Sequence, residues 1–136
     1  MNYEIIDLND EQIENLETKL DEYDRNHINY KIDGNISIGV LFDGKIIAGV
    51  NACMTAYKIL YVSTVYVDEE YRDMGIGRKL METVEEKALN LGVNMIRLDT
   101  FGWQGVEFYK KLGYEQVGSY TNEIDGFSEY FFLKRL

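Results

Sequence analysis

The sequence Arg72-Asp73-Met74-Gly75-Ile76-Gly77 says most about how this chain folds. It follows an apolar, strand-like run over residues 60–67 and leads into a strongly helical segment over residues 78–91. Two glycines between a strand and a helix let the backbone approach a ligand closely. Free N–H groups and the positive end of the helix favour an anion there. The spacing therefore predicts a phosphate-binding loop.

Two other glycine loops that bind phosphates do not fit this stretch. A dinucleotide-binding fingerprint needs a third glycine three residues after the second, where this chain has Leu80. The strands before the loop also look like a hairpin meander rather than a βαβ opening. A Walker A loop needs Gly-Lys-Ser/Thr, which is missing after Gly77. A structural turn without a ligand remains as the plain alternative.

Size and composition predict one domain that covers residues 1–136. The chain has 136 residues, 46% hydrophobic and 13% aromatic, which suits one packed core and no second one. No apolar run reaches the ~18 residues of a membrane span, and no export signal is recognisable. The single cysteine, Cys53, excludes an internal disulfide. We therefore expect a cytoplasmic protein with no membrane partner.

The charge of the chain limits its partners. Its 24 acidic and 14 basic residues give a net charge of −10, which disfavours nucleic acid as a partner. A cationic small molecule or a basic peptide fits better, although the acidity could equally serve only solubility. Against this background, the basic residues Arg72, Arg78 and Lys79 gather beside the glycine loop, which again indicates a specifically bound anion.

Hydrophobic spacing and turn residues predict strands over residues 3–7, 36–42, 45–55, 57–67, 94–100, 114–120 and 129–134. Helices are predicted from Asn9 to about Tyr23 and over residues 78–91 and 105–112. Asn9 and Gln12 have the spacing of a capping box, and Asp43-Gly44 is a strong hairpin signal. In the helix over residues 78–91, an apolar face is predicted to point inward and Gly92 to end the helix; this face is formed by Leu80, Met81, Val84, Ala88 and Leu91. Together these elements predict an α+β (mixed α/β) domain with a mixed sheet.

The glycine loop and the later stretch Phe108-Tyr109-Lys110-Lys111-Leu112-Gly113-Tyr114 together resemble the GNAT superfamily of acetyl-CoA-dependent N-acetyltransferases. The resemblance extends over nearly the whole chain, up to residues 130–133. It implies a single GNAT-like domain with a mostly antiparallel, twisted, mixed sheet of about seven strands flanked by three to four helices. It also implies acetyl-CoA as cosubstrate and no metal.

By this resemblance, two segments bind the cofactor. Backbone N–H groups of the loop would bind the pyrophosphate of coenzyme A, and the strand before it would pair with the pantetheine arm. These residues are Val65, Tyr66 and Val67 in the strand and Arg72, Asp73, Met74, Gly75, Ile76, Gly77 and Arg78 in the loop. Many family members also have a cofactor-contacting asparagine where this chain has Gly102, so Gln104 is a candidate substitute.

Tyr109 is the candidate general acid. Thioester cleavage expels a thiolate with an ordinary pKa of about 8.5, and a phenol with an ordinary pKa of about 10 is protonated at neutral pH and able to protonate it. The resemblance implies this role and a cofactor contact for Tyr109. The alternative is a core aromatic, because Val106, Tyr109 and Leu112 share one helical face.

The residue that deprotonates the amine cannot be assigned from the sequence. Asp68, Glu69, Glu70 and Asp99 each suit a base acting through water or a solvated surface acid equally well. His27 fits a surface or substrate-side position better than a catalytic one. A Cys53–His27 nucleophile pair is rejected, because nothing in the sequence brings the two together and a buried strand cysteine is the default.

These observations predict acetyl transfer from acetyl-CoA to a primary amine by direct attack, with an oxyanion stabilised by backbone N–H groups of residues 65–67. A non-catalytic acyl-CoA-binding module of the same fold is the alternative, and an acetyltransferase acting on aminoacyl-tRNA is disfavoured by the charge. The acceptor, a small-molecule or peptide amine, stays open, with a mild preference for a cationic one. Dimers are frequent in the family, so a homodimer is one option.

Overall fold

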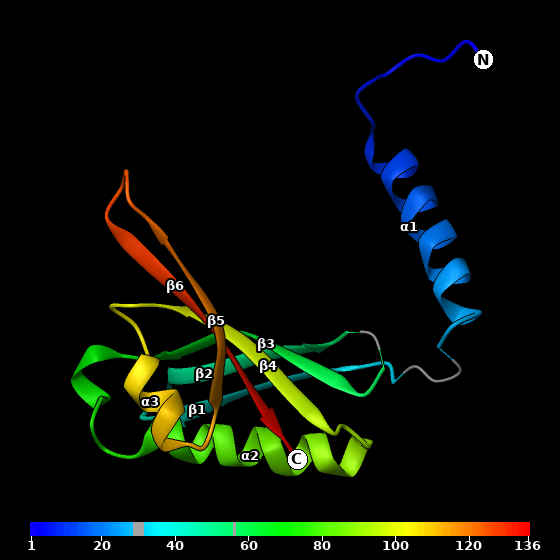
Figure 1. Ribbon diagram of the computed structural model, residues 1–136. Coiled ribbons are helices and arrows are strands. Elements are labelled where there is room, and N and C mark those ends of the chain that lie inside the picture. Colours follow the sequence, from blue (N-terminus) through cyan, green and yellow to red (C-terminus); the bar gives the residue numbers. More distant parts are fainter. Residues whose placement is uncertain (29–31, 56) are drawn as a thin grey trace. The chain divides into compact units, whose positions relative to one another are not determined.

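The structure, a computed structural model, describes residues 1–28, 32–55 and 57–136 (Figure 1). The chain divides into two compact units, Met1–Lys31 and Ile32–Leu136, and each is described by itself below.

The N-terminal unit contains one helix, α1 (Asp10–Arg25). The predicted capping box is confirmed: the Gln12 amide donates to Asn9 Oδ1, and the Asn9 amide donates to Gln12 Oε1, both at 2.9 Å. The helix runs two residues beyond the predicted end at Tyr23. No residue of α1 is buried, so its apolar side chains are exposed.

The predicted strand over residues 3–7 is wrong. Residues 1–9 form neither helix nor strand. The alternation of Tyr3 and Ile5 with polar residues suits a half-buried strand, but a strand exists only where a neighbour accepts and donates its backbone hydrogen bonds.

The C-terminal unit is built on a six-stranded sheet with strand order β1-β2-β3-β4-β6-β5. Its strands are β1 (Asn35–Phe42), β2 (Lys45–Met54), β3 (Ile59–Val67), β4 (Met95–Phe101), β5 (Glu115–Asn122) and β6 (Phe127–Arg135). Only β3 and β4 pair in parallel. The predicted α+β fold with a mostly antiparallel mixed sheet is thus confirmed, with six strands instead of about seven, since residues 3–7 form no strand.

The hairpin between β1 and β2 forms at the predicted place. Asp43 and Gly44 both have positive φ angles, 49° and 74°, as the tight turn of a two-residue hairpin requires. The next strand begins at Ile59, later than the predicted 57, because Tyr57 also has a positive φ of 65° and belongs to the turn. Residue 56 lies outside the described residues.

Two helices cover one face of this sheet, α2 (Ile76–Leu91) and α3 (Val106–Lys111), while a short 3-10 turn, η1 (Glu69–Tyr71), precedes α2 (Figure 1). The helix α2 packs across β1, β2 and β3 and buries Leu80, Met81, Val84 and Ala88 of the predicted apolar face. Leu91, which was predicted on the same face, is 42% exposed at the end of the helix. Gly92, with a φ of 91°, ends it as predicted. No helix in the part of the chain that the structure describes is long and apolar enough to cross a membrane.

The core joins these helices to the centre of the sheet. Leu60 on β3, Ile96 on β4 and Phe132 on β6 are completely or almost completely buried. Lys134 at the end of β6 adds a polar link, because its Nζ donates to Glu85 Oε1 at 3.0 Å and to the Leu112 carbonyl at 2.8 Å. One amine thus connects β6 to α2 and to the end of α3.

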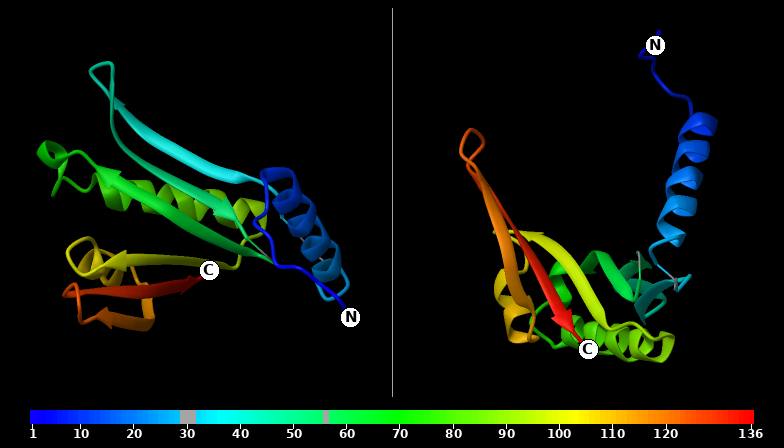
Figure 2. Two further views of the ribbon diagram at one scale, coloured as in Figure 1. Left: turned by 90° about the horizontal axis from the view of Figure 1, so that it is seen from above. Right: turned by 45° about the vertical axis from the view of Figure 1, so that its right-hand side comes forward.

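The strands β3 and β4 pair only over their first halves. Their parallel register runs from Ile59 opposite Met95 to Val62 opposite Leu98 and then stops. On the other edge of β3, the register against β2 shifts at Ser63, an extra residue that forms a bulge and increases the local twist. Beyond this bulge β3 and β4 diverge (Figure 2, left), and residues 64–67 are paired with β2 alone.

We expect Leu60→Ala to lower the free energy of unfolding by about 2–5 kcal/mol, because it leaves a cavity at the closed end of the β3–β4 pair. Leu41→Ala removes the same atoms from a side chain that is 69% exposed. This control should change the free energy of unfolding by less than about 0.5 kcal/mol. Urea unfolding of both variants measures the difference. Equal losses would contradict this placement of the core.

Candidate functional site

The glycine loop joins the end of β3 to the start of α2. The helix begins at Ile76, two residues earlier than predicted, after Gly75 in a left-handed conformation with a φ of 81°. Its first backbone hydrogen bond runs from the Lys79 amide to the Gly75 carbonyl at 3.1 Å. The amides of residues 73–78 donate to no acceptor in the described part of the chain. A run of free N–H groups at a helix N-terminus is a site for an anion.

One predicted amide does not belong to this run. The Arg72 N–H already donates to the Glu69 carbonyl at 3.3 Å, within the turn of η1. Its side chain is also committed in part, since Nε donates to the Val67 carbonyl at 2.9 Å and the guanidinium lies 5.5 Å from the centre of the Tyr66 ring. Arg72 therefore holds the loop against the end of β3, and its remaining N–H groups face solvent.

The two positions of the loop require glycine for different structural reasons. A side chain on Gly75 would meet nothing within 4 Å, so its requirement is the positive φ. A Cβ on Gly77 would lie 3.2 Å from two ring carbons of Phe108, so Gly77 is needed for close packing of α2 on α3. The sequence suggested that both glycines serve a ligand, whereas Gly77 serves the contact between two helices.

The predicted cofactor strand lies directly beside the loop. Val65 and Val67 are partly buried and Tyr66 is exposed. Because β4 has already diverged at this point, the edge of residues 63–67 that faces β4 has no strand partner. An extended ligand can add backbone-like hydrogen bonds to such an edge.

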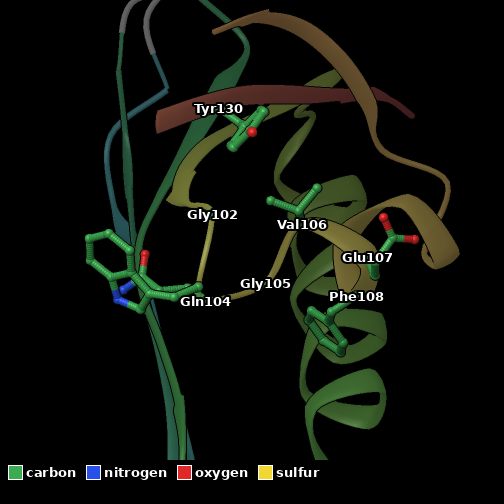
Figure 3. A pocket seen from close by; sticks show the side chains of 8 residues that line it. Gly102, Gln104, Gly105, Val106, Glu107, Phe108 and Tyr130 are labelled. Carbon is green, nitrogen blue, oxygen red and sulfur yellow. The ribbon is translucent and has the colours of Figure 1, made fainter. Parts of the chain in front are cut away.

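A cavity of about 330 Å³ lies between the end of β4 and the start of α3, lined by residues 102–108 and Tyr130 (Figure 3). The side chains of Val106 and Tyr130 point into it, and Glu107 points away. Phe108 lines this cavity and also touches the position of Gly77, so the loop and the cavity share one wall.

Gln104 has a structural task at the edge of this cavity. Its Oε1 accepts hydrogen bonds from the Phe101 amide at 2.8 Å and from Thr100 Oγ1 at 3.4 Å, which closes the turn between β4 and α3. The predicted cofactor contact of Gln104 therefore rests on its NH₂ group. Trp103, in the same turn, is 69% exposed and stacks on Phe101.

Tyr109 places a buried ring beneath this turn. Its ring packs against Phe108, Tyr114 and Phe132, and a Cβ on Gly105 would lie 2.9 Å from it. Its hydroxyl has no hydrogen-bond partner among the described residues, yet it is not sealed from solvent. Burial, and then the charge of Asp99, raise the pKa of Tyr109 to about 12. The ring is thus a core aromatic, and the hydroxyl is free to donate.

Tyr114 shows the contrasting arrangement in the same cluster. Its hydroxyl donates to Glu85 Oε1 at 3.5 Å, beside the Lys134–Glu85 ion pair. Burial, and then the charge of Glu85, raise the pKa of Tyr114. Its proton is already engaged in a structural bond, so of these two buried tyrosines only Tyr109 has a hydroxyl available to a ligand.

The acidic residues considered as general bases, the histidine and the cysteine lie on different elements of the structure. Asp99 is exposed on β4 and accepts a hydrogen bond from the Tyr61 hydroxyl at 2.8 Å, which raises the pKa of Tyr61. Asp68 precedes η1, and Glu69 and Glu70 form part of that exposed turn. His27 contacts the Tyr23 ring within the N-terminal unit. Cys53 is a free, partly buried residue of β2.

Sequence reasoning missed Phe108 and Tyr61. Phe108 was quoted only as part of a motif, although it separates the loop from the cavity. The bond from Tyr61 to Asp99 joins residues far apart in the chain, and strand alternation could have placed both on one face only if the β3–β4 register had been known.

Comparison with known families matches this geometry. A sequence profile of the acetyltransferase (GNAT) family matches residues 3–114. The chain belongs to this family of N-acetyltransferases. A solved acetyltransferase from Bacillus cereus is 31% identical, with a TM-score of 0.90, and the match covers 98% of both chains.

Two further relatives match over a smaller share of at least one of the two chains. The thialysine N-epsilon-acetyltransferase of Bos taurus is 37% identical over 43% of this chain, and the match spans about a third (35%) of that protein's length. The PaiA N-acetyltransferase of Thermoplasma acidophilum, solved in complex with coenzyme A, is 22% identical with a TM-score of 0.65, covering 95% of this chain and 80% of the other. The latter likeness shows the shared fold.

We expect alkaline pH to destabilise the protein through Tyr109. Because folding raises its pKa from about 10 to about 12, its stabilisation is complete below pH 10 and is lost as pH rises towards 12, by roughly 1.4 kcal/mol for each unit. Between pH 9 and 11, the free energy of unfolding of the Tyr109→Phe variant should therefore decrease less than that of the wild type. Tyr66→Phe, which alters an exposed phenol, is the control. Identical losses in all three proteins would contradict burial of the Tyr109 phenol.

Proposed function

We propose that this protein transfers an acetyl group from acetyl-CoA to a primary amine by direct attack. The observation that carries this proposal is the run of free amides at residues 73–78 beside the unpaired edge of residues 63–67. Together they offer an anion site and an extended hydrogen-bonding edge, which are the two features that a pyrophosphate joined to a pantetheine arm requires.

The residues of the site fit this cofactor in a definite order. The amides of Asp73, Met74, Gly75, Ile76, Gly77 and Arg78 would hold the pyrophosphate, with Arg72 and the Arg78 side chain adding positive charge. Val65, Tyr66 and Val67 would pair with the pantetheine arm. The Gln104 NH₂ group would contact the cofactor from the turn between β4 and α3. When bound, acetyl-CoA supplies the activated acetyl thioester.

Tyr109 is the group that we assign to the leaving thiolate. The attacking nitrogen forms the new C–N bond, the C–S bond breaks, and Tyr109 gives its proton to the sulfur. The nitrogen loses a proton to water, and water returns one to Tyr109. A pKa of about 12 keeps the phenol protonated until negative charge develops beside it. Backbone N–H groups of residues 65–67 would stabilise the oxyanion.

The amine class of the acceptor is supported by the family and by one relative. The bovine relative is named for acetylating the side-chain nitrogen of thialysine, although this chain spans only about a third of its length. The chain has a net charge of −10, and such an excess of acidic residues favours the approach of a cationic amine.

We expect Gly75→Ala to weaken coenzyme A binding by at least about tenfold, since it strains the conformation that presents the free amides. Gly44→Ala is the matched control, because Gly44 also has a positive φ (74°) with open space around it, but lies in the β1–β2 hairpin. Calorimetric titration with coenzyme A compares them. If both variants bind like the wild type, the loop does not hold the cofactor.

We expect Tyr109→Phe to lower kcat by ~10²–10⁴-fold with little change in coenzyme A affinity, because only the proton donor is removed. Tyr114→Phe removes a hydroxyl from the same aromatic cluster, and should cost stability through Glu85 while leaving kcat within about threefold. Thiol release measures turnover. If the Tyr109→Phe variant turns over a good substrate as fast as the Tyr114→Phe variant, Tyr109 is not the general acid.

A further inference from the structure

An exposed group of aromatic side chains surrounds one carboxylate near the end of β4. In the register of the sheet, Glu129 on β6 lies between Phe101 on β4 and Tyr120 on β5. Trp103 stacks on Phe101 with ring centres 4.9 Å apart, and Phe127 packs edge-on against both, at 5.6 and 6.2 Å. We call Phe101, Trp103, Tyr120, Phe127 and Glu129 the aromatic–acidic surface.

This surface lies on the face of the sheet opposite α2. Along β4, Leu98 and Thr100 are buried beneath the helices, whereas Asp99 between them is exposed, so alternation puts Asp99 and Phe101 on the other face. Trp103 and Tyr120 are 69% and 46% exposed. Within the unit Ile32–Leu136, a ligand can therefore reach these rings without any rearrangement of the core.

The acidic groups of this face have no counter-ion. In the described ranges, no ion pair involves Glu129 or Asp99. Glu129 is the cross-strand partner of Tyr120 and raises its pKa, and Asp99 accepts a hydrogen bond from the Tyr61 hydroxyl. Arg97 lies on the same face, but its guanidinium stacks over the Tyr61 ring at 4.4 Å. Each carboxylate keeps lone pairs that a cation can fill.

Asp99 connects this surface to the proposed acid. Glu129, opposite Tyr120 on the neighbouring strand, raises the pKa of Tyr120, with a smaller contribution from the charge of Asp99. Burial, and then the same Asp99 charge, raise the pKa of Tyr109. Asp99 is therefore within electrostatic reach of Tyr109 on the cofactor side and of Tyr120 on the opposite face.

We propose that the aromatic–acidic surface binds the acceptor, and that the acceptor is an amine with a second positively charged group. The second ammonium lies between the carboxylate of Glu129 and the ring faces of Trp103 and Tyr120, while the reacting amine points past Asp99 towards the gap between β3 and β4. Ring faces attract ammonium groups, and a carboxylate adds a charge-assisted hydrogen bond. This inference rests on the acetyl transfer proposed above and names its substrate class.

Other occupants satisfy this surface less well. An apolar partner would cover Glu129 and Asp99 and leave both carboxylates desolvated without a cation. A nucleic acid or an acidic peptide would meet them with like charge. The amino group of a monoamine would lie between β3 and β4, and no group of the ligand would contact Glu129 or Trp103.

The first experiment compares three primary amines of matched length in the thiol-release assay with acetyl-CoA: 1,4-diaminobutane, butylamine and 4-aminobutanoate. Only the far group differs, being cationic, neutral or anionic. We expect kcat/KM to fall in that order, with at least about tenfold between the diamine and butylamine. Equal values for the diamine and butylamine would overturn the proposal.

Variants then test the residues. Glu129→Gln should raise KM for the diamine by at least about tenfold, leave kcat nearly unchanged, and leave butylamine kinetics as they were. Glu123→Gln makes the same charge change on an exposed residue of the β5–β6 connection and should alter neither substrate. A diamine preference that survives Glu129→Gln contradicts the assignment.

Trp103 offers a readout that needs no turnover, because it is the only tryptophan of the chain. Titration with 1,4-diaminobutane should change its fluorescence saturably, and Glu129→Gln should shift the midpoint by at least about tenfold. Butylamine should give no such change in that range. An unchanged emission with the diamine would overturn binding at this surface.

The two readouts separate this inference from the proposed function. A fluorescence response without thiol release, from the diamine or from a panel of amino acids, aminoglycosides and peptides, retains the cation-binding surface and rejects acetyl transfer, and with it the acceptor role. Thiol release with other amines, but no response of Trp103 to the diamine, retains acetyl transfer and rejects the inference. Circular dichroism of Glu129→Gln confirms that any loss is not one of folding.

Discussion

The site depends on the separation of two parallel strands. The strands β3 and β4 pair from Ile59 to Val62, and the bulge at Ser63 then turns β3 away. In a closed sheet the backbone groups of residues 63–67 would be used by a neighbour and would have nothing to offer a ligand. The unpaired edge is tolerable because it lies at the surface beside the glycine loop, where solvent or a ligand can satisfy it. The core residues Leu60 and Ile96 hold the paired half closed, so the open half has a fixed geometry.

The packing of α2 on α3 has a second consequence for the chemistry. Gly77 lets Phe108 approach the first turn of α2, and Gly105 lets the Tyr109 ring lie beneath the turn after β4. The two glycines therefore fix where the loop and the phenol stand in relation to each other. Burial of the ring raises the pKa of Tyr109. In the same aromatic cluster, the Tyr114 hydroxyl and Lys134 Nζ both donate hydrogen bonds to Glu85. The core thus supplies both the position and the protonation state of the proposed acid.

Local signals in the sequence predicted the fold well, and the exceptions have physical causes. The capping box at Asn9, the hairpin at Asp43-Gly44 and the glycine after α2 depend on neighbouring residues alone, and all three are found. The strand over residues 3–7 failed because alternation indicates a strand only if a partner exists, and no local pattern states where one is. Within the site, the loop and Tyr109 were visible as motifs. The engagement of the Arg72 amide, the turn closed by Gln104 and the row of Phe101, Glu129 and Tyr120 arise from tertiary register, which a single sequence does not reveal.

The sheet separates two kinds of electrostatic environment in an otherwise acidic chain. On the helix side, the free amides of residues 73–78 and the basic side chains beside them attract an anion. On the opposite face, Asp99 and Glu129 carry negative charge without a basic partner in the described part of the chain. The charge of Asp99 also contributes to the raised pKa of Tyr109, after burial. An anionic donor held on one face and a cationic acceptor held on the other would meet without either entering the unfavourable field of the other's site. This arrangement gives a physical reason for a strongly acidic acetyltransferase to keep a small, local cluster of basic residues.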